Sequence, residues 1–323
     1  MRILLWHVHG SWTDAFVRGG HDYLLPVEPG GGPWGLGRAG RDWPPNVREV
    51  SFGDLRPDDV DVVIAQRVPE VASVRARLGP VVPLVYVEHN TPRGDVPDTR
   101  HPMADRDDVV LVHVTSFNRL MWHSGDAETV VIGHGIPDPG HRYTGALGRT
   151  AMVVNEPVRR GRVTGTDLIP LFARVTPVDV FGIDVDALPG ALGVPADRLC
   201  GVGDLGLAEL HDELARRRVY LHLARWTSLG LSLLEAMHLG MPVVALACTE
   251  AVTAVPPDAG VVHTDPDVLL AGLRRLVDDP DLAAATGRAA RAHALEHFGL
   301  GRFLESWDDL LVTVTRRRRR TPP

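Results

Sequence analysis

The chain has 323 residues, enough for two α/β domains, and its 44% hydrophobic content supports a folded core. A net charge of −7 argues against general nucleic-acid binding. All 34 basic residues are arginine, which excludes lysine Schiff-base chemistry and, with the abundant Ala, Gly, Val and Pro, suggests a high-GC bacterial genome. Cys200 and Cys248 lack metal-ligand spacing, and neither a membrane span nor a signal peptide is recognisable. We therefore expect a cytoplasmic protein.

The first half of the sequence alternates expected strands with expected helices. Strands are expected at residues 2–9, 23–27, 61–65, 82–87, 107–114 and 129–132, and helices at residues 12–18, 69–78 and 116–123. Gly10 lies in the turn after the first strand, where ligands collect in doubly wound sheets, so it is a candidate ligand contact or an ordinary turn glycine. Residues 28–45, rich in Gly, Pro and Trp, predict a long functional loop.

Polar residues crowd the end of the expected strand at residues 82–87. Glu88, His89 and Asn90 follow that strand directly. Because the carboxyl ends of parallel strands form ligand sites, His89 is a candidate site residue. The alternative is that His89 only bonds a nearby loop carbonyl.

A second domain is expected after a Pro- and Gly-rich boundary at residues 139–144. Strands are expected at residues 151–154, 178–182, 199–205, 219–223, 243–246 and 260–263, and helices from residue 166 and at 207–217, 231–239, 265–278, 280–298 and 300–314. Arg159, Arg160 and Arg162 lie in the loop after the first of these strands. They are candidates for charge-assisted bonds to phosphate, or simply a solvated loop.

Residues 226–246 contain the most informative stretch, WTSLGLSLLEAMHLGMPVVAL. Thr227 and Ser228 suit a helix N-cap, and Gly230 permits close backbone approach. The helix at 231–239 should present the N–H groups of Leu231 and Ser232 to a phosphate, with Glu235 as the only acid one turn later. The alternative is that this is an ordinary glycine-capped helix before a buried strand.

This stretch resembles the nucleotide-sugar site of retaining GT-B glycosyltransferases of family 4, of the actinobacterial type, whose run is similar to EGFGLVLLEAMACGLPVVA. Glu235 matches the second Glu of that run, and Thr227 replaces the first. The resemblance implies an α/β GT-B fold of two Rossmann-like doubly wound domains facing a cleft. It divides the chain into an acceptor-side domain (1–140), a nucleotide-sugar-binding domain (145–300), a helix crossing back (300–315) and a basic tail (316–323), which we expect to be disordered.

The resemblance also implies a function, namely sugar transfer from a nucleoside-diphosphate sugar to an acceptor with retention of configuration. Glu235 would hold the donor ribose, and His89 and the Thr227 position would contact the sugar. The remaining donor-binding candidates are Gly230, Leu231, Ser232, Arg159, Arg160, Arg162 and Gly10. No metal and no cofactor is expected.

Two alternatives remain open at this stage. One is a GT-B sugar-nucleotide isomerase, which would need no acceptor. The other is a catalytically silent nucleotide-sugar-binding or partner protein, since Thr227 replaces a Glu and the family's phosphate-clamping Lys is missing. Expected partners are the donor and a small-molecule, glycan or carrier-bound acceptor, but no nucleic acid. The tail at Arg316 to Arg320 could contact an anionic membrane weakly.

Overall fold

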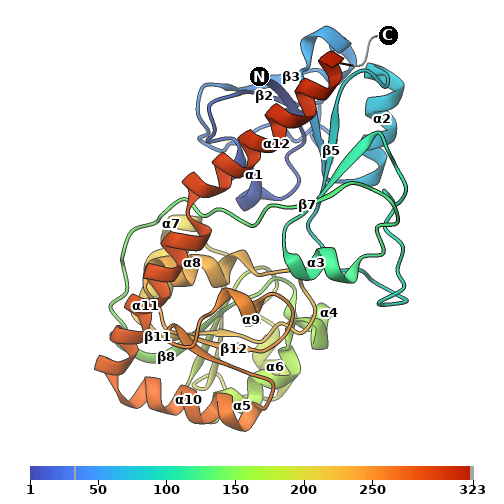
Figure 1. The fold of residues 1–323 in the computed structure, drawn as a ribbon. Coiled ribbons are helices and arrows are strands. Elements are labelled where there is room, and N and C mark those ends of the chain that lie inside the picture. The colour runs from blue at the N-terminus through green and yellow to red at the C-terminus, as the bar shows by residue number, and fades with distance from the viewer. Residues whose placement is uncertain (33, 321–323) are drawn as a thin grey trace. The chain divides into compact units, whose positions relative to one another are not determined.

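The computed structural model describes residues 1–32 and 34–320 (Figure 1). The chain divides into two compact units, each built around its own parallel sheet. The first unit comprises Met1–Gly135 and the segment from Leu300 onward, and the second comprises Ile136–Gly299. The division lies just before the boundary expected at residues 139–144. The backbone N–H of Ile136 bonds the carbonyl of Phe298, which attaches this residue to the second unit.

The first unit contains a seven-stranded sheet of order β3-β2-β1-β4-β5-β6-β7, in which every pair is parallel. Its strands are β1 (Arg2–Leu5), β2 (Asp22–Pro26), β3 (Val47–Val50), β4 (Val62–Ala65), β5 (Leu84–Glu88), β6 (Val109–His113) and β7 (Thr129–Val131). Its helices are α1 (Gly10–Phe16), α2 (Val68–Leu78), α3 (Ser116–Met121) and α12 (Leu300–Arg320), with 3-10 turns at Phe52–Asp54 and Pro57–Asp59.

The sheet of the first unit is apolar on both faces, as parallel sheets require. Alternate residues point to opposite sides, so Ile3 and Leu5 join one core while Leu4 joins the other. Trp12 of α1 and Trp307 of α12 belong to the first of these cores, and α2 covers the second.

The second unit contains a six-stranded parallel sheet of order β10-β9-β8-β11-β12-β13. Its strands are β8 (Leu147–Val153), β9 (Val178–Phe181), β10 (Leu199–Gly203), β11 (Arg217–His222), β12 (Val243–Leu246) and β13 (Gly260–His263). Its helices are α4 (Pro157–Arg160), α5 (Ile169–Ala173), α6 (Leu188–Leu192), α7 (Leu207–Arg216), α8 (Leu231–Leu239), α9 (Ala251–Ala254), α10 (Pro266–Asp278) and α11 (Pro280–Phe298), with 3-10 turns at Gly161–Thr164 and Thr166–Leu168. One core lies under α7, α8, α9 and α11, and the other under α5, α6 and α10.

Two expectations about local structure are wrong. The tail was expected to be disordered, but α12 continues as a helix to Arg320, and residues 321–323 lie outside the described part. Arginine is a good helix former and its charge suits a helix C-terminus, while Arg317 pairs with Glu128. The cap of α8 is Gly230 rather than Thr227 or Ser228, and no side chain caps this helix.

Candidate functional site

The order of strands in the second unit reverses between β8 and β11. The chain winds from β8 outward to β10 and then returns to the other side of β8 with β11. In open α/β sheets, ligands bind outside the carboxyl ends of the strands at such a reversal. The two segments that leave these strands carry most of the candidate residues of the sequence. One contains the three arginines, and the other leads into α8.

Arg225 connects these two segments through hydrogen bonds and an ion pair. Its backbone N–H donates to the carbonyl of Val163 at 2.9 Å, and its Nη1 donates to the carbonyl of Arg162 at 2.9 Å. The same guanidinium pairs with Asp167, through Nη2 to Oδ2 at 3.0 Å. The sequence prediction missed Arg225, although its place directly after the central strand of the domain was a usable signal.

The three candidate arginines differ in what they contact. Arg159 is exposed and donates from Nε to Glu156 at 2.7 Å, and Arg162 is exposed and donates from Nη1 to Asp167 at 2.9 Å. Arg160 is half-buried at the end of α4. The short helical turns at Pro157–Arg160 and Gly161–Thr164 replace the open loop that the sequence predicted.

Gly230, the N-cap of α8, is packed against a histidine. A Cβ at Gly230 would lie 2.8 Å from Cε1 of His222, the last residue of β11, while the φ of −72° is ordinary for any residue. Glycine is therefore required here for space. The N–H groups of Leu231 and Ser232 open the helix and have no acceptor within it. Burial lowers the pKa of His222 to about 4, so its ring is neutral at pH 7.

Glu235 lies one turn into α8 and is buried, with 7% of its surface exposed. Its Oε2 lies 3.8 Å from Nε2 of His211 on α7, beyond hydrogen-bonding distance. Nε2 of His211 is itself buried without a hydrogen bond. No described residue donates a hydrogen bond to the Glu235 carboxylate, and a buried carboxylate is costly unless a donor reaches it.

Ser232 and Leu231 form the half-buried start of α8. The hydroxyl of Tyr220, on β11, donates to Oγ of Ser232 at 2.9 Å. This bond fixes the serine rotamer and leaves the serine O–H free to donate to a ligand. Thr227 is half-buried in the segment between β11 and α8. The structure thus brings Thr227, Gly230, Ser232 and Glu235 to one end of one sheet.

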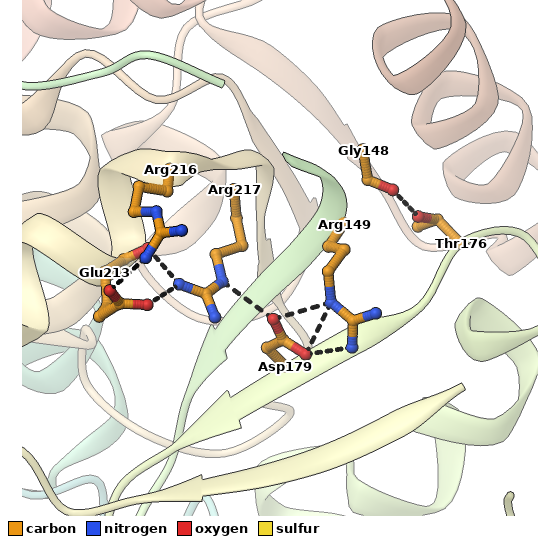
Figure 2. A network of polar contacts seen from close by, with 7 residues as sticks. All are labelled: Gly148, Arg149, Thr176, Asp179, Glu213, Arg216 and Arg217. Carbon is orange, nitrogen blue, oxygen red and sulfur yellow. Dashed lines mark hydrogen bonds and ion pairs between the residues drawn. The ribbon is translucent and has the colours of Figure 1, made fainter. Parts of the chain in front are cut away.

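Near the amino-terminal ends of the strands of the same sheet, charged side chains form a network of ion pairs (Figure 2). Asp179 on β9 accepts bonds from Nε of Arg149 and from Nε of Arg217, each at 2.9 Å. Arg217 also pairs with Glu213 on α7. These residues lie in the first half of their strands, away from the carboxyl ends, so they belong to the framework of the domain rather than to the candidate site.

The first unit holds His89 in a group of aromatic rings. His89 follows β5, with its ring centroid 4.0 Å from that of His9 and 5.2 Å from that of Trp12. Burial, and then the neighbouring His9 and His134, hold the pKa of His89 well below its ordinary value. Gly10, beside His9, begins α1, and a Cβ there would lie 2.5 Å from Nη2 of Arg41. His89 and Gly10 therefore lie at the same edge of the first sheet.

The described residues contain neither a metal-binding cluster nor a membrane-spanning helix. No cluster of three or more His, Cys, Asp or Glu in residues 1–32 and 34–320 is arranged to hold a metal ion. Within the same ranges, every helix is too short or too polar to cross a membrane.

Comparisons with known proteins show a family match in the second unit and similar folds. Residues 197–293, which include Glu235, match the family model described as Glycosyl transferases group 1. Comparison with curated proteins gives no match. Sucrose-phosphate synthase from Thermosynechococcus elongatus has a similar structure, with a TM-score of 0.73, 14% identity and coverage of 98% of this chain and 100% of that chain.

Two further solved structures are similar over nearly the whole chain. HepE from Anabaena, solved in complex with UDP, has a TM-score of 0.72 and 16% identity over 97% of this chain and 100% of that chain. A glycosyltransferase from Rickettsia africae has a TM-score of 0.67 and 15% identity over 97% and 98%. The chain therefore has the GT-B fold of two Rossmann-like domains, and its second unit contains a stretch that matches the group 1 glycosyl transferases.

Proposed function

We propose that the protein is a glycosyltransferase that uses a nucleoside-diphosphate sugar as donor. The observation that carries this proposal is Glu235, a buried carboxylate without a hydrogen-bond donor among the described residues, at the reversal of the second sheet. A ribose diol supplies two O–H donors, which is what this carboxylate lacks. The group 1 match over residues 197–293 and the solved complexes of HepE with UDP and with UDP-glucose support this proposal.

The diphosphate would bind at the start of α8. The N–H groups of Leu231 and Ser232 point out of the helix where its dipole favours an anion. Arg159, Arg160 and Arg162 would add positive charge from the neighbouring segment, which Arg225 holds in place. Donors fixed before the reaction stabilise the charge that develops on a leaving diphosphate.

The reaction we propose is transfer with retention of configuration, as in family 4, without a metal or a cofactor. His89 is proposed to contact the sugar as a neutral ring, and Gly10 to allow close approach of a ligand to the first unit. Thr227 replaces a carboxylate by a hydroxyl, which changes the hydrogen bonds offered to the sugar. We place this activity in the bacterial cytoplasm, with the Arg316–Arg320 end of α12 as a weak contact for anionic membranes.

A silent nucleotide-sugar-binding protein is the second candidate, and Thr227 is the observation that favours it. An isomerase is the third candidate and would convert the donor without an acceptor. Donor hydrolysis or transfer, measured with the bound nucleotide sugar, separates these candidates. A silent protein gives no turnover, whereas an isomerase gives a new nucleotide sugar.

Thermal unfolding against UDP, GDP, ADP, dTDP and their sugars, without metal, tests the donor site. A ligand at about 100 times its dissociation constant adds about 2.7 kcal/mol to the free energy of unfolding. We expect one base to raise the unfolding midpoint above the others. Midpoints that stay at the value of the ligand-free protein with every nucleotide would contradict the donor site.

A further inference from the structure

The first unit has a strand reversal of its own, between β1 and β4. The chain winds from β1 to β3 on one side and returns with β4 on the other side of β1. The segments that leave these two strands are the His9–Gly10 turn and the Gln66–Arg67 pair. By the same rule as in the second unit, a ligand crevice is expected between them. Two arginines border this place.

Arg41 comes from the loop between β2 and β3. Its guanidinium lies against Gly10, where a Cβ would be 2.5 Å from Nη2 and 3.2 Å from Cζ. The ring of Trp43 lies near it, with the centroid 6.0 Å from Cζ. In the described part of the chain, no carboxylate forms an ion pair with Arg41, although Asp42 is its neighbour in sequence.

The loop that carries Arg41 is held in place by a different arginine. Nη1 of Arg38 donates to the carbonyl of Val47 at 2.9 Å, and its Nε donates to the carbonyl of Arg41 at 3.3 Å. Nδ1 of His7 lies 3.0 Å from the carbonyl of Gly37. Arg38 therefore uses its N–H groups to bond the backbone of the loop. Arg41 is not used in this way, and its guanidinium lies at the turn after β1.

Arg67 follows β4, on the other side of the reversal. Its Nε donates to Glu70 at 2.6 Å, while its Nη2 is buried without a hydrogen bond. Glu70 already accepts the backbone N–H of Gln66 at 2.6 Å, and that of Arg67. Trp34, from the same loop as Arg41, lies over the guanidinium of Arg67 at 4.5 Å. Buried N–H donors without acceptors are costly, so this group favours an incoming oxygen.

We propose that this reversal is an oxyanion site, and that the acceptor of the sugar is a phosphate ester held by Arg41 and Arg67. The proposal rests on the proposed glycosyltransferase function. Arginine donates through a planar fork to phosphate oxygens, and a tetrahedral phosphate offers oxygens in several directions to two such forks. Trp34, which lies over Arg67, and Arg41 come from the same loop, and Arg38 holds that loop in place through hydrogen bonds. The acceptor class is therefore a phosphorylated molecule, either free in solution or at the headgroup of a lipid.

The test is titration calorimetry of the full chain in the presence of saturating UDP, which fills the nucleotide site. The probes are inorganic phosphate, glucose 6-phosphate with glucose as its uncharged counterpart, glycerol 3-phosphate, and phosphatidylcholine vesicles with and without phosphatidylglycerol. Arg41→Gln is the informative variant, because Arg41 is exposed and its loss should leave the fold intact. Arg48→Gln is the matched control, an exposed arginine on β3 of the same unit.

We expect at least one phosphate probe to bind, and Arg41→Gln to weaken that binding by about tenfold or more while Arg48→Gln does not. Binding of the soluble esters identifies a free acceptor, and binding of the phosphatidylglycerol vesicles alone identifies a lipid. The inference is overturned if no phosphate probe binds, or if both variants bind equally well. UDP affinity should be unchanged in Arg41→Gln. If UDP itself fails to bind, the proposed function fails, and the same titrations without UDP still decide the role of Arg41.

Discussion

We call the amino-terminal ends of the strands the amino edge of the sheet, and their carboxyl-terminal ends its carboxyl edge. Buried carboxylates at these two edges of the second sheet differ in how they are paired. At the amino edge, Asp179 is 2% exposed and receives bonds from both Arg149 and Arg217 (Figure 2). At the carboxyl edge, Glu235 is nearly as buried, and no described residue donates a hydrogen bond to it. The chain stabilises the first carboxylate, whereas the second has no hydrogen-bond donor among the described residues. Burial of a charge thus indicates a ligand site only where the partners are missing.

This difference separates a structural role from a binding role at equal burial. The Asp179 network spans β8, β9 and β11, so it fixes these strands relative to one another. A buried group that only a ligand can satisfy does not stabilise the ligand-free protein. Substitution of Asp179 should therefore change stability, and substitution of Glu235 should change ligand affinity.

The largest effect on stability is expected for Asp179→Ala. This change removes the only carboxylate that pairs with the half-buried Arg149 among the described residues, and it leaves Arg217, whose side chain is 9% exposed, with Glu213 alone. Removing one partner of a buried ion pair costs about 3–5 kcal/mol. Chemical denaturation measures this loss as a drop in the free energy of unfolding.

Asp212→Ala is the control for Asp179→Ala. Asp212 pairs with Arg142 at 2.9 Å, but its side chain is 67% exposed, so its removal should cost less than about 1 kcal/mol. Nucleotide affinity should be unchanged in any Asp179 variant that folds. Equal losses of stability in the two variants would show that the network is not a framework element.

A smaller effect on stability is expected when the pH is lowered, through His222 at the carboxyl edge. Burial holds the pKa of His222 at about 4, whereas the unfolded chain has an ordinary histidine pKa of about 6.5. Between these values the unfolded chain binds more protons, so the free energy of unfolding falls as the pH falls. Between about pH 6.5 and about pH 4, this proton linkage lowers the free energy of unfolding by about 3 kcal/mol in total. Above about pH 6.5 none of this stability is lost.

His222→Asn removes this proton-linked term. Denaturation from about pH 7 to about pH 5 should then show a smaller loss of stability than in the unchanged protein, by about 2 kcal/mol. An identical pH dependence in the two proteins would mean that His222 is not buried as a neutral ring.

A loss of stability of similar or smaller size is expected for Gly230→Ala. The new methyl would meet the ring of His222, and overpacking of this kind costs about 1–3 kcal/mol. Gly206→Ala is the control, because Gly206 is the N-cap of α7 and a Cβ there meets nothing within 4 Å. If both alanine variants lose the same stability, the cost comes from helix capping and not from contact with His222.

Much of the fold could be predicted from local sequence patterns. The expected ranges at residues 231–239, 243–246 and 260–263 coincide with α8, β12 and β13, because each is an apolar run with clear glycine or proline limits. Several elements of four or five residues were missed, because a run this short does not establish a period. These include β3, α4, α6 and α9.

The candidate site was predicted in part. The position of Glu235 in a helix after the central strand could be predicted from its spacing, but its neighbour His211 could not. That contact depends on how α7 packs against α8, and it joins residues 24 positions apart. Arg149, Asp179 and Arg217 were missed for the same reason, since strand register brings them together. Arg41 was missed because a loop without regular structure carries it to Gly10.

The most direct test of the account is the affinity for UDP, measured by titration calorimetry without metal, of Glu235→Gln and of the unchanged protein. Glu209→Gln, an exposed position on the neighbouring α7, is the control with the same change of charge. A hydrogen bond to a charged group contributes about 1.5–3 kcal/mol, so Glu235→Gln should bind UDP roughly 10- to 100-fold more weakly while Glu209→Gln is unchanged. Equal affinity in all three proteins would contradict a nucleotide site at Glu235.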